Sequence, residues 1–157
     1  MCLVDRFVKN TAEILSLLNE ITSKMQMVEH GFLSDDGKVQ LTVFRNVPAS
    51  IFDHEVRVVV NKGDRNFTLN SKYGKEVILP PYGFLVECPT FIAFHALSWN
   101  GIMYDTPVLF TIQSQDGASI EWSSKVRIFH GFGNSRLKLR DKMLEVAREA
   151  VEKIRCQ

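Results

Sequence analysis

The sequence predicts a mainly β protein: an antiparallel β-sandwich of about eight strands with an N-terminal helix and a C-terminal helix. Three observations support this fold class. Short apolar segments recur between residues 38 and 131, and turn-forming sequences such as NKGD, PPYG, SWNG and SQDG separate them. No long helical segment lies between these strands, as an α/β sheet would require. The segments before and after them carry apolar residues at helical spacing instead.

The N-terminal segment, residues 3–28, has the pattern of an amphipathic helix. Asn10 followed by Glu13 has the spacing of a capping box, which indicates either a fresh helix start at Thr11 or a break between a short helix and a longer one. The apolar residues recur every three or four positions: Val4, Phe7, Val8, Ile14, Leu15, Leu17, Leu18, Ile21 and Met25.

Turn formers at residues 31–37 mark the change from helix to strands. The dipeptide Asn100-Gly101 suits the type I′ turn of a two-residue hairpin. Gly131 and Gly133 predict a bulge or a close approach of two backbones. The expected strands lie near residues 38–45, 55–61, 65–69, 75–79, 83–88, 90–97, 107–114 and 125–131.

The C-terminal segment LRDKMLEVAREAVEKIRCQ places Met143, Ala147, Val151 and Ile154 on one face at helical spacing, which predicts a helix. The predicted organisation is a docking or connector helix at 1–29, a β-sandwich domain at 30–139 and a helical extension at 140–157.

Composition narrows the expected partners. With 45% hydrophobic residues, a chain of 157 residues can bury one sizeable core. Nineteen basic and eighteen acidic side chains leave a formal charge of +1, so we expect no nucleic-acid partner. No segment approaches the roughly 20 apolar residues of a membrane span, and no signal-peptide pattern is visible, so no membrane partner is expected and the location is undefined. The three cysteines lack disulfide or zinc spacing, and we expect no metal or cofactor.

Several segments together resemble a known domain type. The matching pieces are VVVN at 58–61, LPPYGF at 79–84, CPTF at 88–91, AFHALSWNG at 93–101, PVLF at 107–110 and KVRIFHGFG at 125–133. They resemble the β-sandwich accessory domain that follows the (β/α) barrel in a group of bacterial glycoside-hydrolase-like proteins. The resemblance covers about two thirds of the chain.

The resemblance implies a non-catalytic accessory domain of a carbohydrate-processing protein, which stabilises or rims a catalytic barrel. The acid and base carboxylates would belong to the barrel, and the N-terminal helix would dock the domain on that barrel or on a homologous chain. The alternative is a self-contained carbohydrate-binding module with a groove lined by exposed Trp99, Tyr104 or Trp122. An independent enzyme using His95 with Asp105 or Glu87 is the least supported reading, because no nucleophile with its base has a recognisable spacing.

The stretch TFIAFHALSWNGIMYD at 90–105 supplies the candidate site: His95, Trp99, Asn100, Tyr104 and Asp105. An exposed Trp99 at a hairpin tip would offer a flat face to a sugar, and Asn100 and Asp105 would bond its hydroxyls. The same residues are equally suited to a domain contact or to internal packing. The alternation of the strand also favours a half-buried His95, bonded to a backbone carbonyl, on one face with Phe91 and Ala93.

Overall fold

The computed structural model describes residues 3–23, 25–45 and 55–153, and within them the chain forms one helix and twelve strands. The helix α1 spans Leu3–Thr22. The strands are β1 Gln26–Phe32, β2 Val39–Arg45, β3 Val56–Asn61, β4 Phe67–Ser71, β5 Lys75–Leu79, β6 Phe84–Cys88, β7 Phe91–Trp99, β8 Ile102–Ser114, β9 Lys125–Phe132, β10 Arg136–Leu139, β11 Lys142–Glu145 and β12 Glu149–Lys153.

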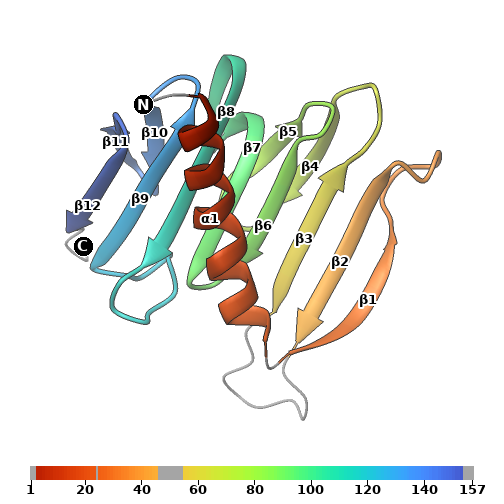
Figure 1. Cartoon of the computed structure of the whole chain (residues 1–157), viewed down its shortest axis with the longest axis horizontal. Coiled ribbons are helices and arrows are strands. Elements are labelled where there is room, and N and C mark those ends of the chain that lie inside the picture. Colours follow the sequence, from red (N-terminus) through yellow and green to blue (C-terminus); the bar gives the residue numbers. More distant parts are fainter. Residues whose placement is uncertain (1–2, 24, 46–54, 154–157) are drawn as a thin grey trace.

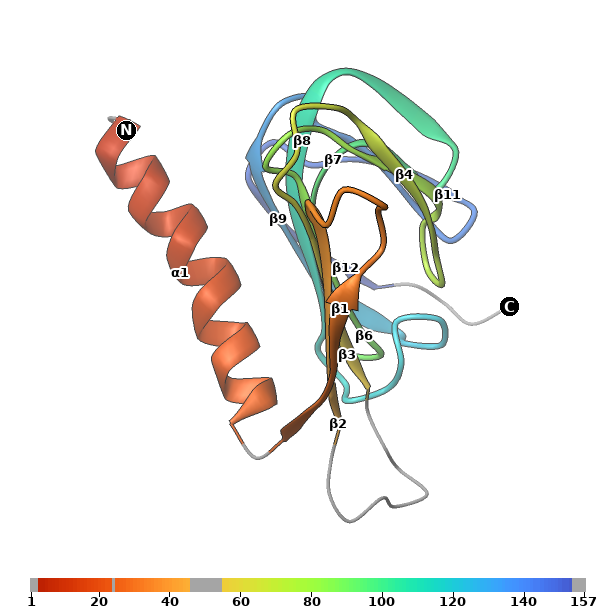
Figure 2. The same ribbon diagram turned by 90° about the vertical axis from the view of Figure 1, so that its right-hand side faces the viewer.

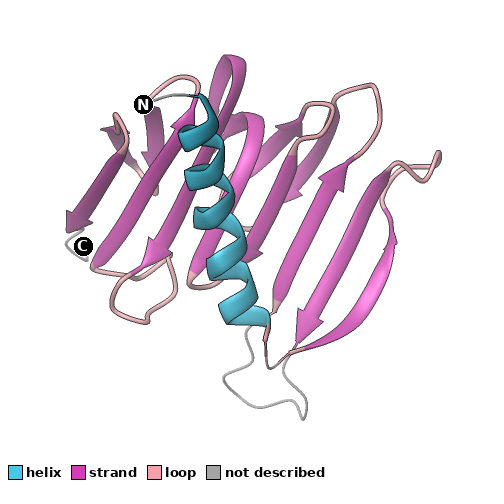
Figure 3. Cartoon of the chain, in the orientation of Figure 1, coloured by secondary structure: helices cyan, strands magenta, loops and turns pink. Residues whose placement is uncertain are grey.

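One antiparallel sheet of eight strands forms the body of the protein, in the order β1-β2-β3-β6-β7-β8-β9-β12 (Figure 1). Neighbours in this order are successive along the chain except at two places. The hairpin β4–β5 is inserted between β3 and β6, and the hairpin β10–β11 is inserted between β9 and β12. The sheet is therefore a meander with two hairpin insertions (Figure 3).

The two faces of the sheet are covered differently. The helix α1 lies over one face, and the inserted hairpins curl over the other (Figure 2). The larger core lies on the hairpin side and includes Ile92, Phe94, Phe110 and Ile128 from the sheet. Its other side is supplied by hairpin residues such as Leu69, Val77, Leu79, Leu137 and Leu144. Alternation along each strand sends successive side chains to opposite faces, which explains why β7 is buried on both.

The helix packs on the second, smaller core with the apolar face that its sequence pattern predicts. Its residues Ile14, Leu17, Leu18 and Ile21 contact the sheet residues Val56, Val86, Cys88, Phe91 and Ala93. Arg127 on β9 donates to both carboxylate oxygens of Glu13, at 2.7 Å each, and its Nε donates to Glu149 at 2.8 Å. A fork of this geometry fixes the orientation of the helix as well as its position.

All eight strands predicted from the sequence are present, so the mainly β, antiparallel fold class is confirmed. The sandwich arrangement is not confirmed, because β4 and β5 pair only with each other and the six other predicted strands share one sheet. The predicted C-terminal helix is wrong for the described residues. Residues 142–145 and 149–153 are the strands β11 and β12, and residues 154–157 lie outside the described part.

The N-terminal helix is continuous through Thr11, so Asn10 and Glu13 mark neither a fresh start nor a break. It ends at Thr22, whose hydroxyl donates to the carbonyl of Leu18 at 2.8 Å. The predicted helix therefore extended six residues too far, since Gln26 already begins β1. This edge strand has no alternating burial to identify it in the sequence.

The turn and bulge predictions at three glycines are confirmed. Asn100 and Gly101 have φ of 48° and 87°, and two positive values in a two-residue connection define the type I′ turn. The register between β8 and β9 shifts next to Leu109, and Gly131 is the extra residue there. A Cβ on Gly133 would lie 2.7 Å from the carbonyl oxygen of Pro107, so that residue marks a close backbone approach.

Candidate binding pocket

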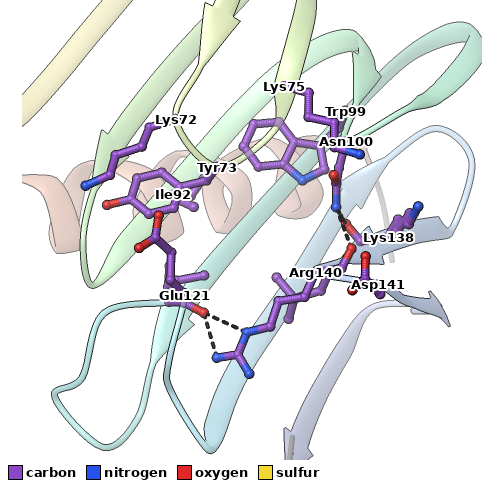
Figure 4. A pocket seen from close by; sticks show the side chains of 12 residues that line it. Lys72, Tyr73, Lys75, Ile92, Trp99, Asn100, Glu121, Lys138, Arg140 and Asp141 are labelled. Atoms are coloured by element: carbon purple, nitrogen blue, oxygen red, sulfur yellow. Dashed lines mark hydrogen bonds between the residues drawn. The ribbon is translucent and has the colours of Figure 1, made fainter. Parts of the chain in front are cut away.

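An open pocket of about 270 Å³ lies between the two inserted hairpins, on the face of the sheet opposite the helix (Figure 4). Its floor is Ile92 of β7 and the indole of Trp99. Its walls come from four connections that are far apart in the sequence: Lys72, Tyr73 and Lys75 of the β4–β5 hairpin, Asn100 of the β7–β8 turn, Ile120 and Glu121 of the β8–β9 loop, and Lys138, Leu139, Arg140 and Asp141 of the β10–β11 hairpin. The volume lies just below the range of about 300–1,000 Å³ usual for small-molecule pockets, so the pocket has room for a small ligand only.

Asn100 joins the two hairpins that form the pocket. Its backbone N–H donates to the carbonyl of Gly74 at 2.7 Å, in the β4–β5 turn. Its side-chain amide donates to the carbonyls of Lys138 and Arg140, both at 3.0 Å, in the β10–β11 turn. The residue is buried, and both of its amide hydrogens are used. The type I′ turn predicted from the sequence therefore sets the distance between the pocket walls.

The loop carrying Ile120 and Glu121 is fixed from two sides. Arg140 donates to the carbonyl of Ile120 at 2.8 Å and to that of Ser123 at 2.7 Å. Asp116 accepts hydrogen bonds from Ser114, Ser123 and Ser124 within the same loop. These bonds hold the pKa of the Asp116 carboxyl well below its usual range, the hydroxyl of Ser123 being the largest cause.

Tyr73 supplies the aromatic surface of the pocket. Its ring is half-buried, and the ammonium of Lys72 lies 5.4 Å from the ring centroid. The carboxylate of Glu121 lies on the same side of the pocket in Figure 4. Burial, and secondarily the charge of Glu121, raises the pKa of the Tyr73 hydroxyl to about 12. At neutral pH this hydroxyl is therefore a hydrogen-bonding group and not a base.

Backbone strain is concentrated around the pocket. Four residues other than glycine have a positive φ in the described chain: Lys75, Tyr82, Asn100 and Arg140. Three of them line the pocket, and only Tyr82 does not. Glycine adopts this conformation without the steric cost that a Cβ brings. Lys75 and Arg140 therefore stand at positions where the backbone conformation favours glycine.

The candidate residues taken from 90–105 do not form one site. His95 is half-buried on the helix side of the sheet, edge-on to Phe84 and Phe132. Burial lowers the pKa of its imidazole, and a backbone hydrogen bond at Tyr82 opposes this shift. Glu87 lies on the hairpin side, as its register partner Ile92 does. The geometry therefore separates His95 from Glu87, one of the two carboxylates considered as its partner in an independent enzyme.

Of the alternatives that the sequence left open for Trp99, the structure shows internal packing. The indole is only 1% exposed, because it stacks on Phe94 at a centroid distance of 4.3 Å and lies under Gly74. Tyr104 is also buried, and its hydroxyl donates to the carbonyl of Arg136 at 2.6 Å. Asp105 is exposed on β8 and does not line the pocket. Only Trp99 and Asn100 of the five candidates reach it.

The cationic wall of the pocket was not predicted from the sequence. Arg140 and Asp141 lie at the start of the segment that was assigned to a helix, and Lys138 lies just before it, where no turn was expected. The β4–β5 turn was visible as a short break between two predicted strands, but nothing local indicated that Tyr73 would face a loop about fifty residues away. Trp122, which is 70% exposed and follows Glu121, was named in the sequence only as a possible groove residue.

Comparison with known proteins gives no relative: no family model, curated protein or solved structure matches the chain. Among the described residues, no group of His, Cys, Asp and Glu side chains is arranged to hold a metal ion. The single helix described in this chain is not apolar enough to cross a membrane.

Proposed function

We propose that this protein is a non-catalytic carbohydrate-binding domain, which holds one sugar unit in the pocket between its two hairpins. The observation that carries the proposal is the combination, in one open pocket, of the Tyr73 ring with unpaired polar side chains such as Lys75, Glu121 and Asp141. An aromatic face packs on the C–H groups of a sugar ring, and surrounding charged groups bond its hydroxyls.

The exposed Trp122 adds a second aromatic surface on the loop that carries Glu121. Its indole is 70% exposed, although tryptophan side chains are usually mostly buried, and exposed apolar side chains of this size mark contact surfaces. In this proposal Tyr73 binds the sugar unit in the pocket, and Trp122 contacts the next unit of a longer chain.

The accessory-domain function remains a second candidate, with a different contact surface from the one expected. The apolar face of α1 packs on the domain's own sheet, which removes it as a surface for a catalytic barrel. The edge strand β1 instead exposes Met27 and Phe32, each 59% accessible. An open edge strand with large apolar side chains favours a covering partner.

The saccharide proposal is tested by titrating the 157-residue protein with short oligosaccharides while recording backbone amide shifts. We expect the largest changes at the amides of the pocket, and loss of these changes in Tyr73→Ala. Tyr82→Ala is the matched control, since Tyr82 is 76% exposed and lies outside the pocket. Shifts that survive in Tyr73→Ala, or that map to the helix side, would reject the pocket as the site.

The accessory-domain candidate is tested by light scattering of the isolated protein. An uncovered β1 edge predicts self-association at high concentration, relieved in the double variant Met27→Lys/Phe32→Lys. A monomer at every concentration counts against this second candidate and leaves the saccharide proposal unaffected.

A further inference from the structure

We propose that the ligand of this pocket is an anionic saccharide, whose sugar ring packs on Tyr73 and whose carboxylate is bound by the lysines of the rim. The inference rests on the proposed function and adds the charge class of the sugar. Uronic acids are the simplest ligands of this chemistry, since they differ from neutral sugars by a carboxylate in place of a hydroxymethyl group.

The charge of the pocket lining is the first argument. Four cationic side chains line it, namely Lys72, Lys75, Lys138 and Arg140, against the two carboxylates Glu121 and Asp141, a local net charge of +2. The whole chain carries only +1, so the remainder of the protein sums to −1. The pocket is thus net positive while the rest of the chain is close to neutral, which favours an anionic ligand there.

These charges also lack an ion-pair partner among the described residues. The ion pairs among the described residues involve Arg45, Arg57 and Arg127 with their glutamates, and none uses a side chain of the pocket. The guanidinium of Arg140 is fixed through Nε and Nη2 by loop carbonyls, and these bonds do not neutralise it. Figure 4 places the ammonium groups of Lys72 and Lys138 at opposite ends of the pocket, so the rim carries positive charge at both ends.

The backbone conformation of Lys75 is an independent argument. This residue is exposed and has φ of 60°, a left-handed conformation that glycine adopts without the steric cost borne by a residue with a Cβ. No described hydrogen bond or ion pair uses its side chain. Ligand binding gives this strained lysine a role, because its side chain makes no structural bond and lines the pocket.

The deciding experiment titrates the protein at low salt with α-1,4-linked digalacturonate, its neutral counterpart galactobiose, and sodium acetate at the same carboxylate concentration. We expect digalacturonate to bind at least about fivefold more tightly than galactobiose, and this advantage to shrink at high salt, because rim charges are screened. Acetate, which lacks the ring, should not bind in the same range.

Two glycine substitutions separate binding from folding. Lys75→Gly relieves the positive φ, so we expect its melting temperature to be equal or higher, while digalacturonate binds about fivefold more weakly and galactobiose is unaffected. Tyr82→Gly is the matched control, because it relieves a φ of 64° at an exposed residue outside the pocket and should leave both affinities unchanged.

The outcomes are distinguishable. Equal binding of digalacturonate and galactobiose would overturn the anionic inference and leave the saccharide proposal standing. No binding of either sugar would overturn both. Acetate binding as tightly as digalacturonate would reject the saccharide and leave only an anion site. Unchanged digalacturonate binding in Lys75→Gly would remove the role assigned to that lysine.

Discussion

The indole ring of Trp99 lies directly against Gly74, so closely that a Cβ on residue 74 would come within 2.6 Å of Cη2. This contact places the tip of the β4–β5 hairpin on the floor of the pocket. It also explains why a tryptophan at a hairpin end, which the sequence allowed to be either exposed or packed, is buried: the inserted hairpin covers it.

Gly74→Ala should therefore destabilise the protein by about 1–3 kcal/mol, because the added methyl group must displace the ring or the hairpin. Urea unfolding measures the free energy, and near-ultraviolet circular dichroism reports the indole environment. Gly31→Ala is the control, since a Cβ there meets no atom within 4 Å. Equal stability of the two variants would show that the Trp99 contact is not tight.

Asn100→Asp should cost about 2–4 kcal/mol, although it is nearly isosteric. The amide donates to two carbonyls, and a carboxylate in its place would face both oxygens without a hydrogen to share. Asn100→Gly should be less damaging, since glycine relieves the φ of 48° while it loses the same two bonds. Thermal unfolding measures the stability of the wild type and the two variants. Equal stability of Asn100→Asp and Asn100→Gly would contradict the expected order.

Glu13→Gln should loosen the helix from the sheet. The substitution weakens the bidentate, charge-assisted hydrogen bond to Arg127. Both side chains are less than a fifth exposed, so we expect the free energy of unfolding to fall by about 1–2 kcal/mol. Hydrogen exchange of the α1 amides measures the local effect. Glu20→Gln on the exposed side of the same helix is the control and should exchange as the wild type does.

The buried carboxyl of Glu87 should make the stability of the protein depend on pH. Burial raises the pKa of its carboxyl above the ordinary value of 4.5, and hydrogen bonds from Ser71 and the charge of Arg57 only partly oppose the shift. The folded state therefore binds the proton more tightly than the unfolded state, and the group's contribution to stability falls as pH rises from about 4.5 through the folded pKa.

The comparison of wild type with Glu87→Gln isolates this effect. We expect the stability of the wild type relative to the variant to decrease between pH 4.5 and pH 7 in urea unfolding. Glu76→Gln is the control, because Glu76 is exposed and its replacement reports the effect of removing a carboxyl that is not buried. A relative stability that rises over this range would reverse the assigned direction.

The elements that the sequence predicted well are those whose burial alternates or is continuous. Strands β6 to β9 lie at the centre of the sheet, and their apolar patterns reflect burial on its faces. The strands that were missed are the two edges of this sheet, β1 and β12, and the inserted hairpin β10–β11. In β12, Val151 is 52% exposed, so its spacing from neighbouring apolar residues carries no information about a core. Pairing with β9 then outweighs the helix propensity of the segment.

The candidate site could be predicted only in part, because it is non-local. A contiguous stretch such as 90–105 is divided between the two faces of the sheet. His95 and Trp99 are four residues apart, so strict alternation would place them on one face, and the register shift between Ala96 and Ser98 separates them. The pocket instead joins turns separated by up to about seventy residues along the chain. Which turns meet depends on the strand order, and local patterns of apolar and turn-forming residues do not give that order.

The strand order also has a consequence for how this protein can change during evolution. Every pair of neighbours in the eight-stranded sheet is joined either directly or through one inserted hairpin, so the pairing depends on short-range connections. The hairpins β4–β5 and β10–β11 leave the meander and return to it at adjacent strands. Their tips can therefore be lengthened or exchanged to accommodate a different ligand while the register of the supporting strands is inherited unchanged.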